Sequence, residues 1–219
     1  MFSYSLILLS LQFLLQVNGV EIEIDATAAA KYESCCVEDL RTSIASYYDK
    51  MSAHFAYPGY TPPQKLKFIL ELRAEDTNGH GMSSHDNIYT AHWLGAEDTI
   101  NPFVQRMILE SSFWSIESFP NDMANKWLQK CFVNYAYMYL HDTSDESKER
   151  PDTTDKTKGP KNASPRECAY WMNYVVKSTG GKPDVAQKVF KLAREGKYTD
   201  AVWKQLTGKS GKQLWDEMK

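Results

Sequence analysis

Two apolar segments of helical length, within residues 103–140, constrain the fold of this chain more than any other feature. A break at residues 119–122 separates them, and Pro120 in that break removes a backbone donor and interrupts the helical pattern. Asn101 is a suitable N-cap for the first segment, with Pro102 at the first helical position. Helices this apolar must bury most of their surface, so we expect the pair at the centre of a folded domain.

The spacing of apolar residues elsewhere predicts strands and further helices around this pair. Alternating apolar residues predict strands at residues 20–25 and 66–72, and residues 88–94 are predicted to form a further strand. The polar stretch 74–85 is predicted to be a loop, and it is too long for a tight hairpin. Helical spacing predicts helices at residues 37–55, 168–180, 183–196, 199–206 and 210–218. The expected fold class is α+β, with a small sheet packed beside a predominantly helical part.

The size and charge of the chain limit what it can be. Its 219 residues suffice for one domain with a substantial core, and 42% hydrophobic with 24% charged residues is typical of a globular protein. The formal net charge is −3. Binding to phosphate groups requires a concentrated positive field, so neither nucleic acid nor an acidic membrane surface is the expected partner.

The N-terminal end has the pattern of a secretory signal. Residues 5–16 form an apolar run, and Val17-Asn18-Gly19 supplies small or modest residues where a signal peptidase cuts. The run is too short to span a bilayer comfortably, so a stable membrane anchor is not expected. We therefore predict a signal peptide at residues 1–19 and a single secreted domain at residues 20–219.

Four cysteines in a secreted protein predict disulfides. They are Cys35, Cys36, Cys131 and Cys168. A bond between the adjacent Cys35 and Cys36 would close a small strained ring, so we expect each of them to pair with Cys131 or Cys168. The sequence leaves open which pairs with which.

Residues 142–166 contain almost nothing apolar and are predicted to form an exposed loop. Asn162-Ala163-Ser164 within this stretch is a sequon for N-glycosylation, which makes Asn162 a candidate glycosylation site. Pro165, directly after the sequon, lowers the expected occupancy.

The most specific pattern lies near the C-terminus. Segment 206–210, LTGKS, is followed by Leu214 and Trp215 in the tail LWDEMK. Together with segment 168–176, CAYWMNYVV, these motifs resemble the end of the plant and bacterial basic secretory proteins, and the resemblance covers residues 34–219. That family is similar to thermolysin-like zinc peptidases. The resemblance therefore implies a compact zincin-like version of the α+β fold.

Members of that family carry zinc on two central helices. The first holds an HExxH motif, in which both histidines bind Zn²⁺ and the glutamate acts as general base on zinc-bound water. The resemblance places this motif on residues 109–113. Glu110 keeps the position of the general base, but Leu109 and Phe113 stand where the histidines should be, and neither side chain has a lone pair to donate.

The second central helix of the family carries an EGxADY-like segment, whose glutamate is the third ligand and whose aspartate supports it. The resemblance places this segment on residues 130–135. Lys130 replaces the ligand glutamate, and Asn134 replaces the aspartate. Zinc without three protein ligands is not held, and a lysine ammonium repels it. An ion pair between Glu110 and Lys130 is one hypothesis for what occupies the former site.

The resemblance thus predicts a secreted, catalytically inactive homologue that needs no cofactor and acts by binding an extracellular protein or peptide. An edge strand near residues 88–94 is the expected contact surface, because such an edge can receive an extended peptide. The alternative is an active metallopeptidase that holds zinc through other ligands, drawn from His80, His85 and His92. A structural component of an extracellular matrix is a third possibility, for which the sequence offers no positive sign.

Overall fold

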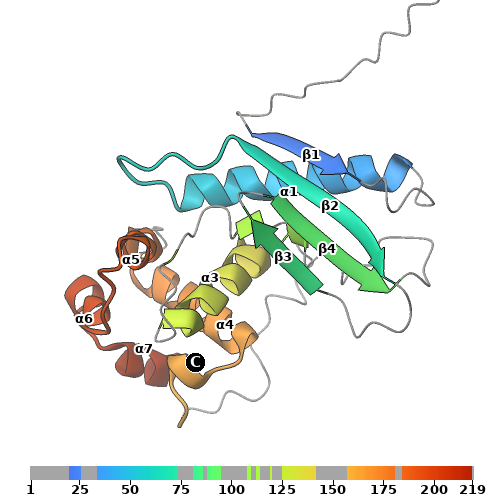
Figure 1. Cartoon of the computed structure of the whole chain (residues 1–219). Coiled ribbons are helices and arrows are strands. Elements are labelled where there is room, and N and C mark those ends of the chain that lie inside the picture. The colour runs from blue at the N-terminus through green and yellow to red at the C-terminus, as the bar shows by residue number, and fades with distance from the viewer. Residues whose placement is uncertain are drawn as a thin grey trace, which may run out of the picture.

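The computed structural model describes residues 20–25, 34–73, 81–85, 88–94, 108–109, 112–113, 119, 125–141, 157–180 and 184–218. These residues form an α+β fold in which a four-stranded sheet lies beside a larger group of helices (Figure 1). The predicted fold class is therefore confirmed. The predicted signal peptide at residues 1–19 lies outside the described residues.

The sheet contains three parallel strands and one antiparallel strand. Its strands are β1 (Glu21–Asp25), β2 (Lys65–Arg73), β3 (Gly81–His85) and β4 (Ile88–Leu94), arranged in the order β1-β2-β4-β3. β1 runs parallel to β2, and β2 runs parallel to β4, while β3 pairs antiparallel with β4. The three strands predicted from the sequence are confirmed.

Two predictions about the sheet are wrong. Residues 74–85 were expected to form a loop, but Gly81–His85 form β3. The segment GMSSH has no apolar alternation, so its pairing with β4 could not be read from hydrophobic periodicity. β4 was expected at the edge, but it is paired on both sides, and β3 is the edge strand beyond it.

Charged side chains join β1 to β2 across their parallel register. Glu21 lies opposite Lys65, and Glu23 lies opposite Lys67. Lys65 Nζ donates to Glu21 at 2.7 Å, and Lys67 Nζ donates to Glu23 at 2.7 Å. The hydrogen bond from Lys67 lowers the pKa of the Glu23 carboxyl below its ordinary value. These pairs are solvent-exposed, so they fix register more than they stabilise the fold.

Helix α1 (Ser34–His54) crosses from β1 to β2 and lies against one face of the sheet (Figure 1). Such a crossover is required because parallel neighbours cannot be joined by a short turn. The helix buries residues at helical spacing, namely Leu40, Ile44, Tyr47, Tyr48 and Met51. Alternate residues of β2, which are Leu66, Phe68 and Leu70, are buried in the same hydrophobic cluster.

The second half of the chain is helical. Its elements are α3 (Lys126–Tyr139), the short 3-10 helix η4 (Pro160–Asn162), α4 (Pro165–Ser178), α5 (Asp184–Arg194), α6 (Ala201–Thr207) and α7 (Gly211–Glu217). α3 and α4 carry long runs of buried residues and are joined by a disulfide. The helices predicted after residue 168 are confirmed. η4 and the first turn of α4 lie within the stretch that was predicted to be loop, which corrects the end of that prediction.

Two serines cap the N-termini of helices α4 and α7 in the same way. Ser210 Oγ accepts from the backbone N–H of Gln213, and the Gln213 side chain accepts from the backbone N–H of Ser210, so the two residues form a capping box. Ser164 forms an equivalent box with Glu167 at the start of α4. This second box is also readable from the sequence, because Ser-Pro-Arg-Glu before an apolar run is a capping-box pattern.

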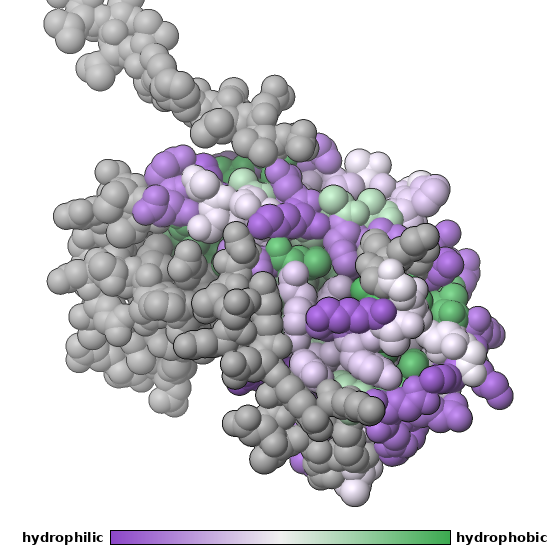
Figure 2. Space-filling view, turned by 180° about the vertical axis from the view of Figure 1, so that it is seen from behind, coloured by the Kyte–Doolittle hydropathy of each residue, from purple (hydrophilic) through white to green (hydrophobic). Residues whose placement is uncertain are grey.

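The surface of the described residues carries few large hydrophobic side chains. Ile88, at the start of β4, is the one large hydrophobic residue among them that is exposed, at 38%. Seen from behind, the described part of the surface mixes hydrophilic and hydrophobic residues (Figure 2). No helix within the described ranges is long and apolar enough to cross a membrane.

Candidate functional site

Phe113, which the resemblance would place at the second histidine of HExxH, carries a buried aromatic ring. Residues 112 and 113 are helical, and Phe113 is 0% exposed. Its ring packs edge-on against Phe55 at a centroid distance of 5.5 Å and against Phe190 at 5.8 Å. Leu109, one turn earlier, is 1% exposed. Leu109 and Phe113 are therefore both apolar side chains packed into the hydrophobic core.

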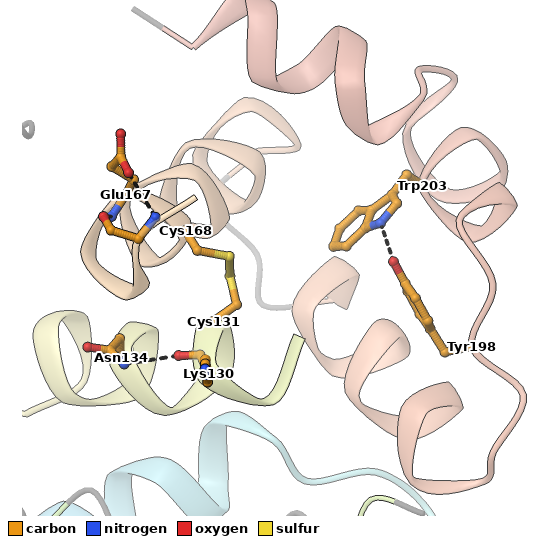
Figure 3. The surroundings of a disulfide bond; sticks show 8 residues. Lys130, Cys131, Asn134, Glu167, Cys168, Tyr198 and Trp203 are labelled. Carbon is orange, nitrogen blue, oxygen red and sulfur yellow. Dashed lines mark hydrogen bonds between the residues drawn. A yellow bond between two sulfur atoms is a disulfide. The ribbon is translucent and has the colours of Figure 1, made fainter. Parts of the chain in front are cut away.

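The corresponding positions on α3 face a different environment. Phe132 contacts the rings of Phe55 and Phe190, each at 5.5 Å, so this side of α3 faces the core. Lys130 lies two residues earlier, roughly 160° around the helix, and is exposed. Asn134 is 8% exposed and its side chain donates to the backbone carbonyl of Lys130 at 3.0 Å (Figure 3).

The three side chains that the resemblance assigns to the ligand positions differ in their exposure to solvent. Leu109 and Phe113 belong to the hydrophobic core, whereas Lys130 lies on the surface. Glu110 lies outside the described residues, so its ion pair with Lys130 stays a prediction.

The alternative zinc ligands are spread along the β3–β4 pair. His85 is opposite Ile88, and His92 is opposite Gly81. The two histidine positions are thus separated by four residues of β4, or about 13 Å of strand. His80 lies outside the described residues. In the part of the chain that the structure describes, no group of three His, Cys, Asp or Glu residues could hold a metal ion.

A half-buried histidine that the sequence did not single out, His54, lies at the end of α1. His54 Nε2 is 3.3 Å from the hydroxyl of Tyr135 on α3. The carbonyl of His54 accepts from Gln187 Nε2 on α5 at 2.7 Å. Burial lowers the pKa of His54 from 6.5 to about 4, so this imidazole is neutral at pH 7. His54 therefore joins three helices through groups that carry no charge.

We expect the pKa of His54 to make stability depend on pH. Between about pH 4 and 6.5 the unfolded chain binds a proton on this residue and the folded chain does not, so the stabilisation is complete above 6.5 and is lost as the pH falls towards 4. The loss should be about 3 kcal/mol. Urea unfolding of the wild type and of His54→Gln at several pH values measures it. Asp49, whose pKa burial raises, is present in both proteins and cancels in the difference. Equal slopes in the two proteins would contradict the assignment.

A disulfide bond joins helices α3 and α4, a pairing that the sequence alone did not determine. Cys131 on α3 is bonded to Cys168 on α4, across a separation of 37 residues (Figure 3). The expectation that each of these pairs with Cys35 or Cys36 is therefore wrong, because each sulfur forms one disulfide. The side chains of Cys35 and Cys36 lie outside the described residues. Packing of α3 on α4 decides the pairing, and that long-range contact cannot be read from cysteine spacing alone.

The predicted glycosylation site lies on the surface directly before a helix. Asn162 is exposed at the end of η4, and its side chain is 3.4 Å from the carbonyl of Lys158. The serine of the same sequon, Ser164, caps α4 and receives the N–H of Glu167 at 3.2 Å. The sequon hydroxyl therefore also has a structural role.

Two substitutions distinguish the effect of losing the glycan from the effect of losing the helix cap at Ser164. After expression through a secretory pathway, we expect both Asn162→Gln and Ser164→Ala to lose the glycan mass. Only Ser164→Ala should lower the free energy of unfolding, by about 1 kcal/mol, because it alone removes the N-cap. Intact mass and urea unfolding measure the two effects, with Ser164→Thr as a control that keeps both. A wild type without glycan mass would contradict the prediction for Asn162.

A cavity of about 320 Å³ lies among η4, α6 and the start of α7. We call it the tryptophan cavity, and it is lined by Trp127, Lys158, Gly159, Pro160, Lys161, Asn162, Asp200, Trp203, Ser210, Gly211 and Lys212. These residues come from four separate stretches of sequence, which is why motif spacing did not reveal it. Helices α6 and α7, which carry part of this lining, lie on the helical side of the domain, away from the sheet (Figure 1).

Comparison with known proteins adds no assignment: no protein-family description matches the sequence, and no significant match to a curated protein is found.

Proposed function

We propose that this protein is a secreted, non-catalytic relative of zincin-type metallopeptidases that acts by binding an extracellular protein or peptide. The observation that carries the proposal is Phe113, which is 0% exposed and packed between other rings where the resemblance calls for a zinc-binding histidine. A metal ion could enter this position only if that packing were dismantled.

Three further features support the proposal. The order of elements, in which a parallel sheet with an antiparallel edge strand precedes the central helices, is compatible with a zincin-like arrangement. The disulfide between Cys131 and Cys168 is consistent with an oxidising compartment. The net charge of −3 favours a protein or peptide over nucleic acid as the partner.

The surface we assign to the partner is the edge strand β3 together with Ile88. β3 has β4 on one side and no neighbour on its other side among the described strands. An extended peptide added there would bond to the strand backbone, and the exposed Ile88 lies beside it in register with His85. This replaces β4, the strand that the sequence suggested.

The catalytic half of the proposal is tested with protein purified from the medium of secreting cells. We expect Val20 as the N-terminal residue and no cleavage of a denatured protein substrate, with or without added zinc. Glu110→Gln should behave like the wild type. Cleavage that a chelator abolishes and that Glu110→Gln lacks would instead establish an active metallopeptidase.

The binding half is tested with peptides selected on the purified protein from a displayed random library. We expect extended peptides whose binding is lost in Ile88→Asp, because a charge at the edge opposes an apolar contact. Lys188→Asp on the exposed side of α5 is the control for added negative charge. Selected peptides that bind Ile88→Asp and the wild type equally would contradict the edge-strand assignment.

A further inference from the structure

The disulfide between α3 and α4 leaves two of the four cysteines with no third cysteine in their own chain to bond with. Cys131 and Cys168 are bonded to each other, and the sequence contains two further cysteines, Cys35 and Cys36. The bonded cysteines are 0% and 3% exposed, so a thiol in solution has little access to their sulfur atoms. Exchange that would free either of them for Cys35 or Cys36 is therefore not expected.

The helical backbone at Cys35 and Cys36 prevents these two residues from bonding to each other. Both lie in the first turn of α1, which begins at Ser34. A disulfide needs Cα atoms about 4.4–6.8 Å apart, and those of Cys131 and Cys168 are 5.1 Å apart. Adjacent residues of a helix are joined by a trans peptide, which holds their Cα atoms only about 3.8 Å apart. A bond between Cys35 and Cys36 would therefore require the start of α1 to unwind.

The described residues that follow the two cysteines are open to solvent. Val37 is half-buried, and Glu38 and Asp39 are exposed. The buried face of α1 begins at Leu40, which is 2% exposed. The helix starts at the end of the domain that lies away from α5 and α6 (Figure 1). This end of α1 therefore has room for a second chain.

We propose that Cys35 and Cys36 join two copies of this chain in a disulfide-linked homodimer. The inference rests on the secretion proposed above, because disulfides form and persist in an oxidising compartment. A second copy supplies the same two cysteines, and a two-fold axis places the same surface of each copy against the other, so all four sulfurs pair within one dimer. A partner of another kind would have to supply two suitably spaced cysteines of its own.

The bond between chains forms by thiol–disulfide exchange with a carrier disulfide of the secretory pathway, on a protein oxidoreductase or in oxidised glutathione. A cysteine thiolate of one copy attacks the carrier, which forms a mixed disulfide and releases one carrier thiolate. A thiolate of the second copy then attacks the sulfur of the first copy, which forms the bond between chains and releases the second carrier thiolate. Each bond thus oxidises two cysteine thiols and reduces one carrier disulfide, whose two sulfurs receive the two protons.

Electrophoresis in SDS tests the dimer on protein purified from the medium of secreting cells, after free thiols are blocked with iodoacetamide. We expect the protein to migrate at twice the mass of one chain without reductant and at the mass of one chain with it. Cys35→Ala with Cys36→Ala should migrate as one chain in both cases. Because the bond closes no loop within one chain, this variant should unfold in urea close to the wild type, which excludes misfolding as the cause.

A tryptic digest without reductant locates the bond and separates failure of the dimer from failure of secretion. Cleavage after Lys31 and Arg41 releases residues 32–41, and we expect two copies of this peptide linked to each other. The bond between Cys131 and Cys168 in the same digest shows that the compartment was oxidising. With that bond present, blocked thiols, an internal disulfide or a bond to another protein in peptide 32–41 would overturn the homodimer alone. Protein retained in the cells with all four cysteines reduced would overturn the proposed secretion, and the homodimer with it.

Discussion

Removing the disulfide with Cys131→Ala and Cys168→Ala together is expected to lower the free energy of unfolding by about 4 kcal/mol. A crosslink across 37 residues restricts the unfolded chain, and the entropy of closing a loop of that length corresponds to this value. Alanine is chosen because both sulfurs are buried, at 0% and 3% exposure, where a serine hydroxyl would add its own desolvation cost. Urea unfolding followed by circular dichroism measures the loss.

The matched control is Cys35→Ala with Cys36→Ala, which keeps the α3–α4 bond and should unfold close to the wild type. A tryptic digest without reductant tests the pairing directly, because cleavage after Lys31, Lys130 and Arg166 places the cysteines in separate peptides. We expect the peptide that begins at Cys131 to be linked to the one that contains Cys168. A link from either of them to the peptide of Cys35 and Cys36 would contradict the structure.

Replacing Phe113 with histidine is expected to destabilise the protein without creating a zinc site. Phe113 contributes a fully buried ring to a cluster with Phe55 and Phe190. Phe113→Ala should therefore cost about 3–5 kcal/mol. Phe113→His should cost a similar amount, because it exchanges apolar contacts for an imidazole with no designed partner. Added zinc should not restore the loss.

The comparison residue is Phe119, which is only partly buried. Its ring centroid lies 6.2 Å from that of Phe132 and 5.5 Å from that of Phe190. Phe119→Ala should lower the free energy of unfolding clearly less than Phe113→Ala does, because folding buries less apolar surface at residue 119. Urea unfolding of the three variants with and without zinc provides the test. A zinc-dependent gain in the stability of Phe113→His would show that metal-binding geometry survives at this position.

Local patterns predicted most of the elements correctly. Alternation at residues 66–72 and helical spacing at residues 37–55 depend on neighbours in sequence, so they could be read directly. Ser210 with Gln213 was predictable for the same reason. β3 was not, because its residues are polar and its pairing with β4 is a tertiary contact.

Features that depend on distant residues were predicted less well. The partner of Cys131 is decided by the packing of α3 on α4, and the tryptophan cavity forms only where η4, α6 and α7 meet. Leu109 and Phe113 were singled out from the sequence because neither side chain can donate to a metal. Their burial in the core, and the exposure of Lys130 on the surface, required the structure.

The central claim is that this chain does not use the zinc chemistry that its resemblance suggests. Elemental analysis of protein purified from secreting cells, without added metal or chelator, tests it most directly. The account predicts zinc far below one equivalent per chain, and no change when Glu110 or His92 is replaced. About one zinc per chain that survives dialysis would contradict it, and loss of that zinc in a variant of His80, His85 or His92 would locate the ligands.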